Sequence, residues 1–190
     1  VAGDDGGAGA EIHARGLVEG ERVRKTAARQ RHDVWPLRRQ LVEGEAPKVD
    51  VDELDSGVDR TGRPTGARFA ALVRSLMAHV TLPDGDDVPP LATALGRTLG
   101  ATGHERRAAI DAVRAALALP LMQRAAGVEH HRPLPVAHRR DDRWIEGHAE
   151  LAFVADGIWT VVAIETDGAH ERRERQRQRV ALLCEAVAAA

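Results

Sequence analysis

Arginine side chains are concentrated in one stretch near the end of the chain, where they could bind phosphate groups. Residues 171–179 contain five arginines, and in a helix Arg172, Arg175 and Arg179 would lie near one face. Arginines clustered in this way contact the backbone phosphates of nucleic acids. The same composition also suits a solvated helix in which glutamates and arginines pair between neighbouring turns. The sequence therefore predicts either a DNA contact at this helix or an ordinary exposed face.

Other residue types that carry binding or catalytic chemistry lack a matching spacing. Four histidines between positions 130 and 148 form no Cys-x-x-Cys or His-Glu-x-x-His pattern, which favours solvent-facing histidines over a zinc site. The chain contains no Gly-x-x-x-x-Gly-Lys-Ser/Thr loop, so ATP hydrolysis is not placed in it. The three tryptophans could stack on bases, although isolated tryptophans are more often packing anchors.

The helices that must position these side chains are predicted from hydrophobic periodicity. Residues 69–80 carry one apolar stripe at helical spacing. Two shorter helices are expected after it, one ended by Gly100 and one ended by Pro120. A last helix is expected over about 169–189, and the arginine run lies in its first half.

The period changes from helical to alternating after about residue 133. Residues 143–153 and 158–165 both alternate, as strands do, and the turn Ala155-Asp156-Gly157 between them is typical of a hairpin. One face of the first strand is expected to be apolar, with Ile145, Gly147, Ala149, Leu151 and Phe153 together. This order predicts an α+β fold, a small mixed sheet with a β-hairpin flanked by helices.

Composition and charge bound the class of protein. Of the 190 residues, 43% are hydrophobic and 29% charged, which is globular composition, and the net charge of −2 means that any DNA contact comes from a local patch. A single cysteine excludes an intrachain disulfide. No apolar run reaches the ~18–20 residues that a membrane helix needs. We therefore expect a cytoplasmic protein without a membrane partner.

The chain is expected to have three parts. Residues 1–10, rich in glycine, alanine and aspartate, are expected to be disordered. Residues 11–62 are expected to form a helical segment over 11–43, broken at Trp35-Pro36, and then a linker. Residues 63–190 form the main domain. The first residue is valine, not methionine, which suggests a fragment of a longer protein.

Several motifs, taken in order, resemble one nuclease family. They are Arg63-Pro64-Thr65-Gly66-Ala67-Arg68-Phe69-Ala70-Ala71-Leu72-Val73-Arg74, then Leu119-Pro120-Leu121, Arg132-Pro133-Leu134-Pro135, Glu146-Gly147-His148-Ala149-Glu150-Leu151-Ala152-Phe153, and Trp159-Thr160-Val161-Val162-Ala163-Ile164-Glu165-Thr166-Asp167. The series is similar to the C-terminal RecB/AddA-type nuclease domain of UvrD-like bacterial helicase–nucleases, and the likeness runs from Gly16 to Val187.

This resemblance implies a PD-(D/E)XK (restriction-endonuclease-like) core and a role in DNA double-strand-break repair and recombination. It also implies DNA as a partner, and a helicase motor upstream in the full-length protein or on a partner subunit. In the family, strand carboxylates hold Mg²⁺ or Mn²⁺, and a lysine on the same strand face helps to activate water.

The residues at the family's catalytic positions differ in this chain. Glu150 stands in place of the first-strand aspartate and keeps a carboxylate that could bind a metal. The other positions have changed type: Arg74 for a metal-binding histidine, Ala163 for the second aspartate, Glu165 for the lysine, Gln176 for a tyrosine and Arg179 for a glutamine.

The changed charges suggest that guanidinium groups replace the metal. Arg74 and Arg179 are expected to pair with Glu150 and Glu165 and so to hold the sheet and helices together, because partly buried carboxylates need such partners. The alternative is a displaced carboxylate cluster of Glu150, Glu165 and Asp167 that still binds Mg²⁺ or Mn²⁺.

Three functions follow from these readings. The favoured one is a catalytically inactive nuclease-like domain, without a cofactor, that serves as a structural or DNA-guiding module of a recombination helicase. The second is a metal-dependent DNA exonuclease that uses displaced carboxylates. The third is a partner-binding scaffold that makes no DNA contact. The fold alone does not establish activity.

Overall fold

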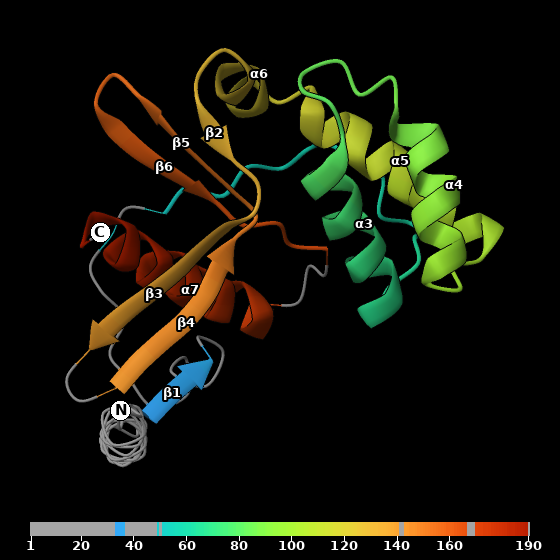
Figure 1. The fold of residues 1–190 in the computed structure, drawn as a ribbon. Helices are drawn as coiled ribbons and strands as arrows, with labels where there is room; N and C mark the ends of the chain where they lie inside the picture. The colour runs from blue at the N-terminus through green and yellow to red at the C-terminus, as the bar shows by residue number, and fades with distance from the viewer. Residues whose placement is uncertain (1–32, 37–48, 50, 141–142, 167–169, 190) are drawn as a thin grey trace, which may run out of the picture.

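The computed structural model describes residues 33–36, 49, 51–140, 143–166 and 170–189. The expected disordered start, 1–10, and most of the expected helical segment lie outside these residues. The described part is α+β, as the sequence predicts. Three helices gather on one side of the molecule, and the strands with the last helix form the other side (Figure 1).

The helical side begins with the helix that has the clearest sequence signal. Its helices are α3 (Ala67–His79), α4 (Val88–Thr98), α5 (Gly103–Leu117) and, next to the strands, the short α6 (Pro120–Ala126). The apolar stripe of α3 is fully buried at Phe69, Leu72 and Leu76, which confirms the predicted helix. The two shorter predicted helices correspond to α4 and α5, and α3, α4 and α5 pack on one another. The sequence reading did not anticipate α6.

The strands form two three-stranded sheets. The strands are β1 (Asp33–Pro36), β2 (His130–His131), β3 (Leu134–Arg140), β4 (Arg143–Ala149), β5 (Leu151–Ala155) and β6 (Ile158–Val162). One sheet has the order β1-β4-β3 and the other has the order β2-β5-β6. β1 pairs in parallel with β4, and the other pairs are antiparallel.

The two sheets are connected through one bent hairpin: β2 and β3 form one arm of it, and β5 and β4 form the other. Leu134 pairs with Ala149 in the first sheet and His131 pairs with Ala152 in the second, so the register is the same on both sides of the interruption. The interruption places Arg132-Pro133 in one arm opposite Glu150 in the other. Proline has no N–H to donate to the ladder, which fits a break at this point. Glu150 therefore lies at a bend between β4 and β5.

Arg132 uses the same break to hold the end of α3. Its Nη1 donates to the carbonyl oxygens of Met77 at 3.2 Å and Val80 at 2.8 Å. Carbonyls at a helix C-terminus lack partners within the helix, and a cation there is favourable. Arg132 thus connects the hairpin to the C-terminal end of α3.

The turn between β5 and β6 has the conformation that its sequence predicts. Asp156 and Gly157 have φ values of 54° and 75°. Positive φ at both central residues defines a type I′ turn, whose twist matches that of the flanking strands. The hairpin is confirmed, although the return strand ends at Val162 and not at residue 165.

The last helix, α7 (His170–Ala188), lies across β3 and β4 and also contacts β6 (Figure 1). It carries Leu182 and Leu183 into the interior, and the helix predicted over 169–189 is confirmed within the described residues.

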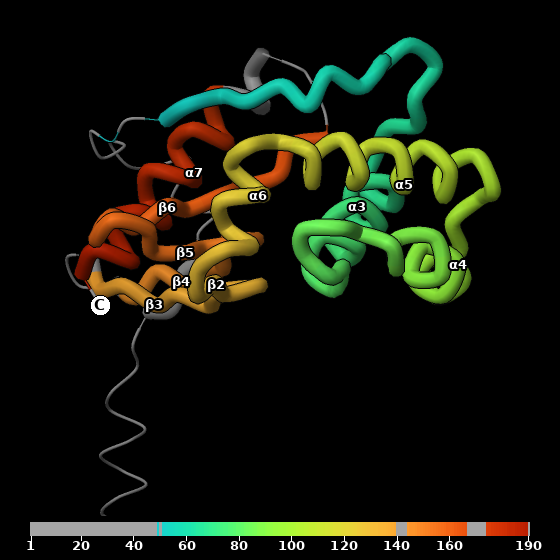
Figure 2. The backbone as a smooth tube through the Cα atoms, turned by 90° about the horizontal axis from the view of Figure 1, so that it is seen from above, coloured from blue at the N-terminus to red at the C-terminus, as the bar shows by residue number. Residues whose placement is uncertain are grey.

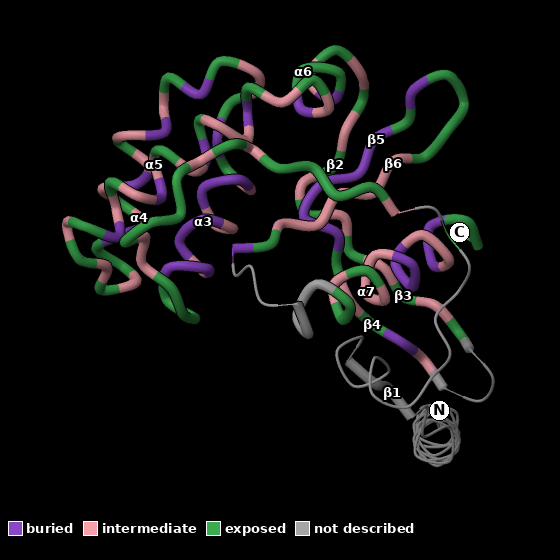
Figure 3. The backbone as a smooth tube through the Cα atoms, turned by 180° about the vertical axis from the view of Figure 1, so that it is seen from behind, coloured by how far each residue is buried: buried purple, intermediate pink, exposed green. Residues whose placement is uncertain are grey.

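Two apolar cores share β5, most of whose residues are buried (Figure 3). The first core joins α3, α4, α5 and α6 to Leu151 and Phe153. The second core consists of Ile145, Ala149, Ala152, Leu182 and Leu183. The single apolar face expected along 143–153 is therefore wrong, because Ile145 and Ala149 enter the second core whereas Leu151 and Phe153, beyond the bend at Glu150, enter the first.

The segment before α3 also differs from expectation. Asp33–Pro36 is a strand and not part of a helix, because it hydrogen-bonds to β4 and because the residue before a proline is driven to extended conformations. Residues 51–66, expected to be a linker, run along one side of the molecule from α7 toward α3 (Figure 2). Arg63 fastens this segment by donating from Nη2 to the carbonyl oxygen of Thr166 at 2.6 Å.

Within the described ranges, no helix combines the length and apolar character needed to cross a membrane.

Candidate functional site

Glu150 is a buried carboxylate between two arginines. Its side chain is 6% exposed, and Arg179 Nη2 lies 3.0 and 3.1 Å from its two carboxylate oxygens. Arg74 Nε lies 3.6 Å from Oε1 on the other side. Arg179 Nη2 also donates to the carbonyl oxygen of His148 at 3.0 Å. The pairing expected from the charge pattern is thus present at Glu150.

The three residues of this triad come from separate elements. Arg74 lies on α3, Glu150 at the bend between β4 and β5, and Arg179 on α7. Glu150 lies at the bend, and each of the two helices supplies one cation to its carboxylate. The triad therefore connects the helical side, the hairpin and the last helix at one point.

The triad carries one surplus positive charge, since two guanidinium groups face one carboxylate. Arg179 is 18% exposed and Arg74 is 40% exposed, so the surplus lies toward solvent on Arg74. Cations at this distance from the carboxylate oppose the binding of a further cation there, because like charges repel. The arrangement can instead attract an anion, and phosphate is a common anion for arginine to bind.

Three other residues at positions that resemble the nuclease family's site line a separate pocket of about 310 Å³ beside α7. Ala163, Glu165 and Gln176 all line it, and Glu165 is exposed. Leu151 pairs with Val162, so Glu150 and Ala163 each lie one residue beyond the last pair of β5 and β6. The pocket and the triad are therefore neighbours across the end of the β5–β6 hairpin.

Gln176 has an unsatisfied amide group. Its Nε2 is buried and has no hydrogen-bond partner among the residues the structure describes. Burying an amide donor without a partner destabilises the folded state.

The outer wall of the pocket is an acidic segment, residues 51–60, which we call the strap. Val51, Asp52, Glu53, Leu54, Asp55 and Arg60 line the pocket from this side. Glu53 Oε1 accepts from Arg177 Nε on α7 at 2.6 Å. This hydrogen bond, together with the charge of Glu53, raises the pKa of Arg177.

The arginines expected to share a DNA-facing side of the last helix are in different situations. Arg179 is turned to Glu150, whereas Arg175 is exposed on α7. Arg172 lies in α7, but its side chain is outside the described residues. Arg177, which is not one of these three, is the arginine that contacts the strap.

No group of three or more histidine, cysteine, aspartate or glutamate side chains within the described ranges is arranged to hold a metal ion. Of the alternative carboxylate cluster, Glu150 belongs to the triad, Glu165 lines the pocket, and Asp167 is outside the described residues. Among the histidines, His138 Nε2 lies 3.2 Å from Glu185 Oε1, and the His131 ring stacks on Trp159 with centroids 6.2 Å apart.

A larger cavity of about 530 Å³ lies between the strap and β6. Four exposed large hydrophobic residues line it: Val49, Leu54, Ile158 and Trp159. Cys184 lies at its wall, and burial raises the pKa of the Cys184 thiol.

Sequence reasoning missed two features of the site. Arg132 was noted only as part of a motif, because nothing local shows that its guanidinium reaches the end of α3. The strap was taken as a linker on account of its glycine and aspartate content. A usable signal was present, since 51–59 holds four acidic residues and no basic one, opposite in charge to the arginine run.

No protein-family model matches the chain, and no curated protein matches its sequence. A family assignment therefore depends on the residues and the geometry described above.

Proposed function

We propose that this chain is a nuclease-like domain with a PD-(D/E)XK core that holds DNA without cleaving it, as part of a recombination helicase of the UvrD-like class. The observation that carries the proposal is the triad. At the one family position that keeps a carboxylate, Glu150 is occupied by Arg74 and Arg179. The two guanidinium groups take the place of the positive charge that a metal ion supplies in the active family members.

The order of the elements supports the fold part of this proposal. A helix that carries Arg74 precedes β5 and β6, which Glu150 and Ala163 adjoin, and a helix that carries Gln176 and Arg179 follows. The last pair of β5 and β6 is Leu151 with Val162, so positions 150 and 163 adjoin the same end of the hairpin, where two strand carboxylates could share a metal.

The charge distribution supports the DNA part. Arg74 is partly exposed with a surplus charge, and Arg175 is exposed on α7. Guanidinium groups bind phosphate oxygens in a fork geometry and keep their charge at every physiological pH. Both arginines are therefore able to contact a DNA backbone, while the site lacks the second carboxylate that cleavage needs.

A nuclease assay on linear DNA with Mg²⁺ or Mn²⁺ tests whether cleavage is lost. We expect no cutting by the chain, and cutting by the triple variant Arg74→His, Ala163→Asp, Glu165→Lys, which restores the family's residue types. Metal-dependent cutting by the unmodified chain that Glu150→Gln abolishes would overturn the proposal and favour the exonuclease that uses displaced carboxylates.

A DNA-binding isotherm at several salt concentrations tests whether the domain touches DNA at all. We expect the logarithm of the association constant to fall linearly with the logarithm of salt, with a slope of about −0.9 per neutralised phosphate on duplex DNA. A slope near zero, or no binding, would favour a scaffold that binds only proteins.

A further inference from the structure

The strap, residues 51–60, is acidic overall and runs beside the arginine-rich helix α7. It carries four acidic residues and one basic residue, Arg60, which pairs with Asp55 at 3.4 Å. It runs along the outside of the molecule, beside α7 (Figure 2). Residues 174–179 of α7, against which it lies at the pocket, hold three arginines and one glutamate.

The contact between the two segments is a direct ion pair. Glu53 Oε1 lies 2.6 Å from Arg177 Nε, and both side chains are about half exposed, at 44% and 51%. Pairs this exposed contribute little to folding stability, because water and salt screen them. A contact that is weak and open to solvent is easily exchanged for another anion.

The strap also forms the outer wall of the pocket beside α7. Asp52, Glu53 and Asp55 share the pocket with Ala163, Glu165 and Gln176. A DNA backbone that approached α7 at this pocket would meet the strap carboxylates first. Like-charge repulsion would then act between the phosphates and the strap.

We propose that the strap is an internal competitor for DNA phosphate, with the Glu53 carboxylate occupying the position on Arg177 that a phosphate takes when DNA binds. The inference rests on the proposed DNA-holding function and adds its regulation. Binding exchanges one anion for another at Arg177, so the strap lowers the affinity for DNA and moves away from α7 in the complex.

The test compares the DNA affinity of Glu53→Gln with that of the unmodified chain by fluorescence anisotropy at low salt. We expect Glu53→Gln to bind about twofold to fivefold more tightly, the range that an exposed ion pair spans. The salt slope should stay about the same, because Arg177 contacts one phosphate in both complexes. In the unmodified chain, DNA should also speed hydrogen exchange in residues 51–60.

A matched control separates the ion pair from general charge effects. Asp59→Asn removes the same charge from the same strap, and Asp59 accepts a hydrogen bond from the backbone of the neighbouring Thr61 at 2.8 Å. We expect a smaller gain from this variant. In an Arg177→Gln background, adding Glu53→Gln should bring no larger gain in DNA affinity than adding Asp59→Asn, because the competition at Arg177 is gone.

The outcomes distinguish the inference from the proposed function. Suppose that the unmodified chain binds DNA with a salt-dependent slope but Glu53→Gln gains no more DNA affinity than Asp59→Asn. The proposal that the strap competes with DNA is then wrong, and the DNA-holding function stands. If neither the unmodified chain nor Glu53→Gln binds DNA at any salt concentration, both are wrong.

Discussion

At the scale of single residues, the triad shows how a buried carboxylate remains in a site without a metal. Glu150 is 6% exposed, and an ionised carboxylate so deeply placed strongly destabilises a fold unless it is paired. Arg179 supplies two short contacts and Arg74 a longer one at 3.6 Å. The closeness and burial of Arg179 make it the dominant partner.

The two arginines are therefore predicted to differ in their effect on stability. Arg179→Met should lower the free energy of unfolding by about 2–4 kcal/mol, because it leaves a buried carboxylate poorly paired. Arg74→Met should cost about 1 kcal/mol or less, since its contact is longer and more exposed. Urea unfolding of both variants measures the difference, and equal losses would contradict it. The double variant Glu150→Met/Arg179→Met, which removes both charges, should recover most of the loss.

For Gln176, unlike Arg179, removal of the polar group is predicted not to lower stability. Its buried amide nitrogen has no partner in the described part of the chain, so removing that group relieves a desolvation cost. Gln176→Met, which is similar in size and apolar, should leave stability unchanged or raise it by up to about 1 kcal/mol. Thermal unfolding checks this, and a clear loss of stability would show that the amide has a structural role.

The residues of the triad were partly predictable from the sequence. A cation at position 74 and another at position 179, with a carboxylate kept at 150, indicated the pairing before any geometry was known. The roles of Glu165 and Gln176 did not follow in the same way, because their surroundings depend on the strap, which lies more than a hundred residues earlier in the chain.

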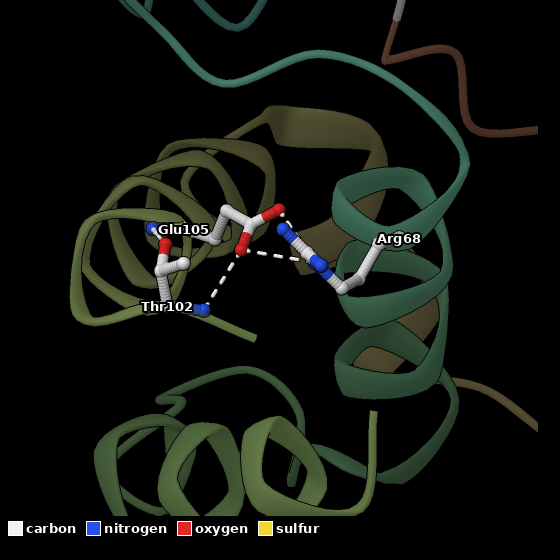
Figure 4. Close-up of polar contacts among 3 residues, drawn as sticks. All are labelled: Arg68, Thr102 and Glu105. Atoms are coloured by element: carbon white, nitrogen blue, oxygen red, sulfur yellow. Dashed lines mark hydrogen bonds and ion pairs between the residues drawn. The ribbon is translucent and has the colours of Figure 1, made fainter. Parts of the chain in front are cut away.

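At the scale of elements, α5 begins with a network that also holds α3. Thr102 and Glu105 form a reciprocal capping box: the Thr102 hydroxyl accepts from the Glu105 backbone at 3.1 Å, and the Glu105 carboxylate accepts from the Thr102 backbone at 2.8 Å. Arg68 of α3 donates from Nε to both carboxylate oxygens of Glu105, at 2.9 and 3.1 Å (Figure 4). The Glu105 carboxylate thus caps α5 and also pairs with Arg68 of α3.

This network predicts how stability depends on pH. The Arg68 side chain and the Thr102 backbone lower the pKa of Glu105 from 4.5 to about 2. A lowered folded-state pKa stabilises the fold above the unfolded-state value of 4.5, and this contribution is lost as the pH falls toward 2. Glu105→Gln keeps a capping box but not the charge.

Thermal midpoints measured from pH 6 to pH 2.5 test the prediction. The unmodified chain should lose more stability than Glu105→Gln as the pH falls through this range, and Arg68→Gln should flatten the difference. Parallel pH profiles for the unmodified chain and Glu105→Gln would show that the network does not shift this titration.

The helices were more predictable than the sheet. The stripe of α3 and the turn at Asp156-Gly157 depend on local chemistry, and both are as expected. The bend at Glu150, the strand β1 and the short helix α6 depend on pairing or packing with distant segments, and the sequence pattern did not show them. In β5, three successive buried residues, Leu151, Ala152 and Phe153, serve two cores, which no single alternation pattern describes.

At the scale of the whole molecule, β5 is the element that both cores share. Leu151 and Phe153 enter the first core and Ala152 enters the second. The triad, the Arg132 contacts with α3 and the Arg63 contact with Thr166 add polar ties between the same parts. A strand buried on both faces cannot leave one core without exposing the other. We therefore expect the described part of the chain to unfold as one cooperative unit.

Two matched substitutions test this cooperativity. Leu76 lies in the first core and Leu183 in the second, and both are 0% exposed. Leu76→Ala and Leu183→Ala should each cost about 3–4 kcal/mol through lost burial and a residual cavity. The tryptophans lie in β1, β4 and β6, so their fluorescence reports on the strands, whereas far-UV circular dichroism reports mainly on the helices.

If β5 couples the cores, each substitution lowers the unfolding midpoint equally by both probes, even though Leu76 lies on a helix without any tryptophan. If the cores unfold separately, Leu76→Ala moves the circular-dichroism transition and leaves the fluorescence transition in place. Separate transitions would also mean that the triad connects two units that unfold independently. Arg179→Met would then change the fluorescence transition more than the circular-dichroism one, because α7 belongs to the second core.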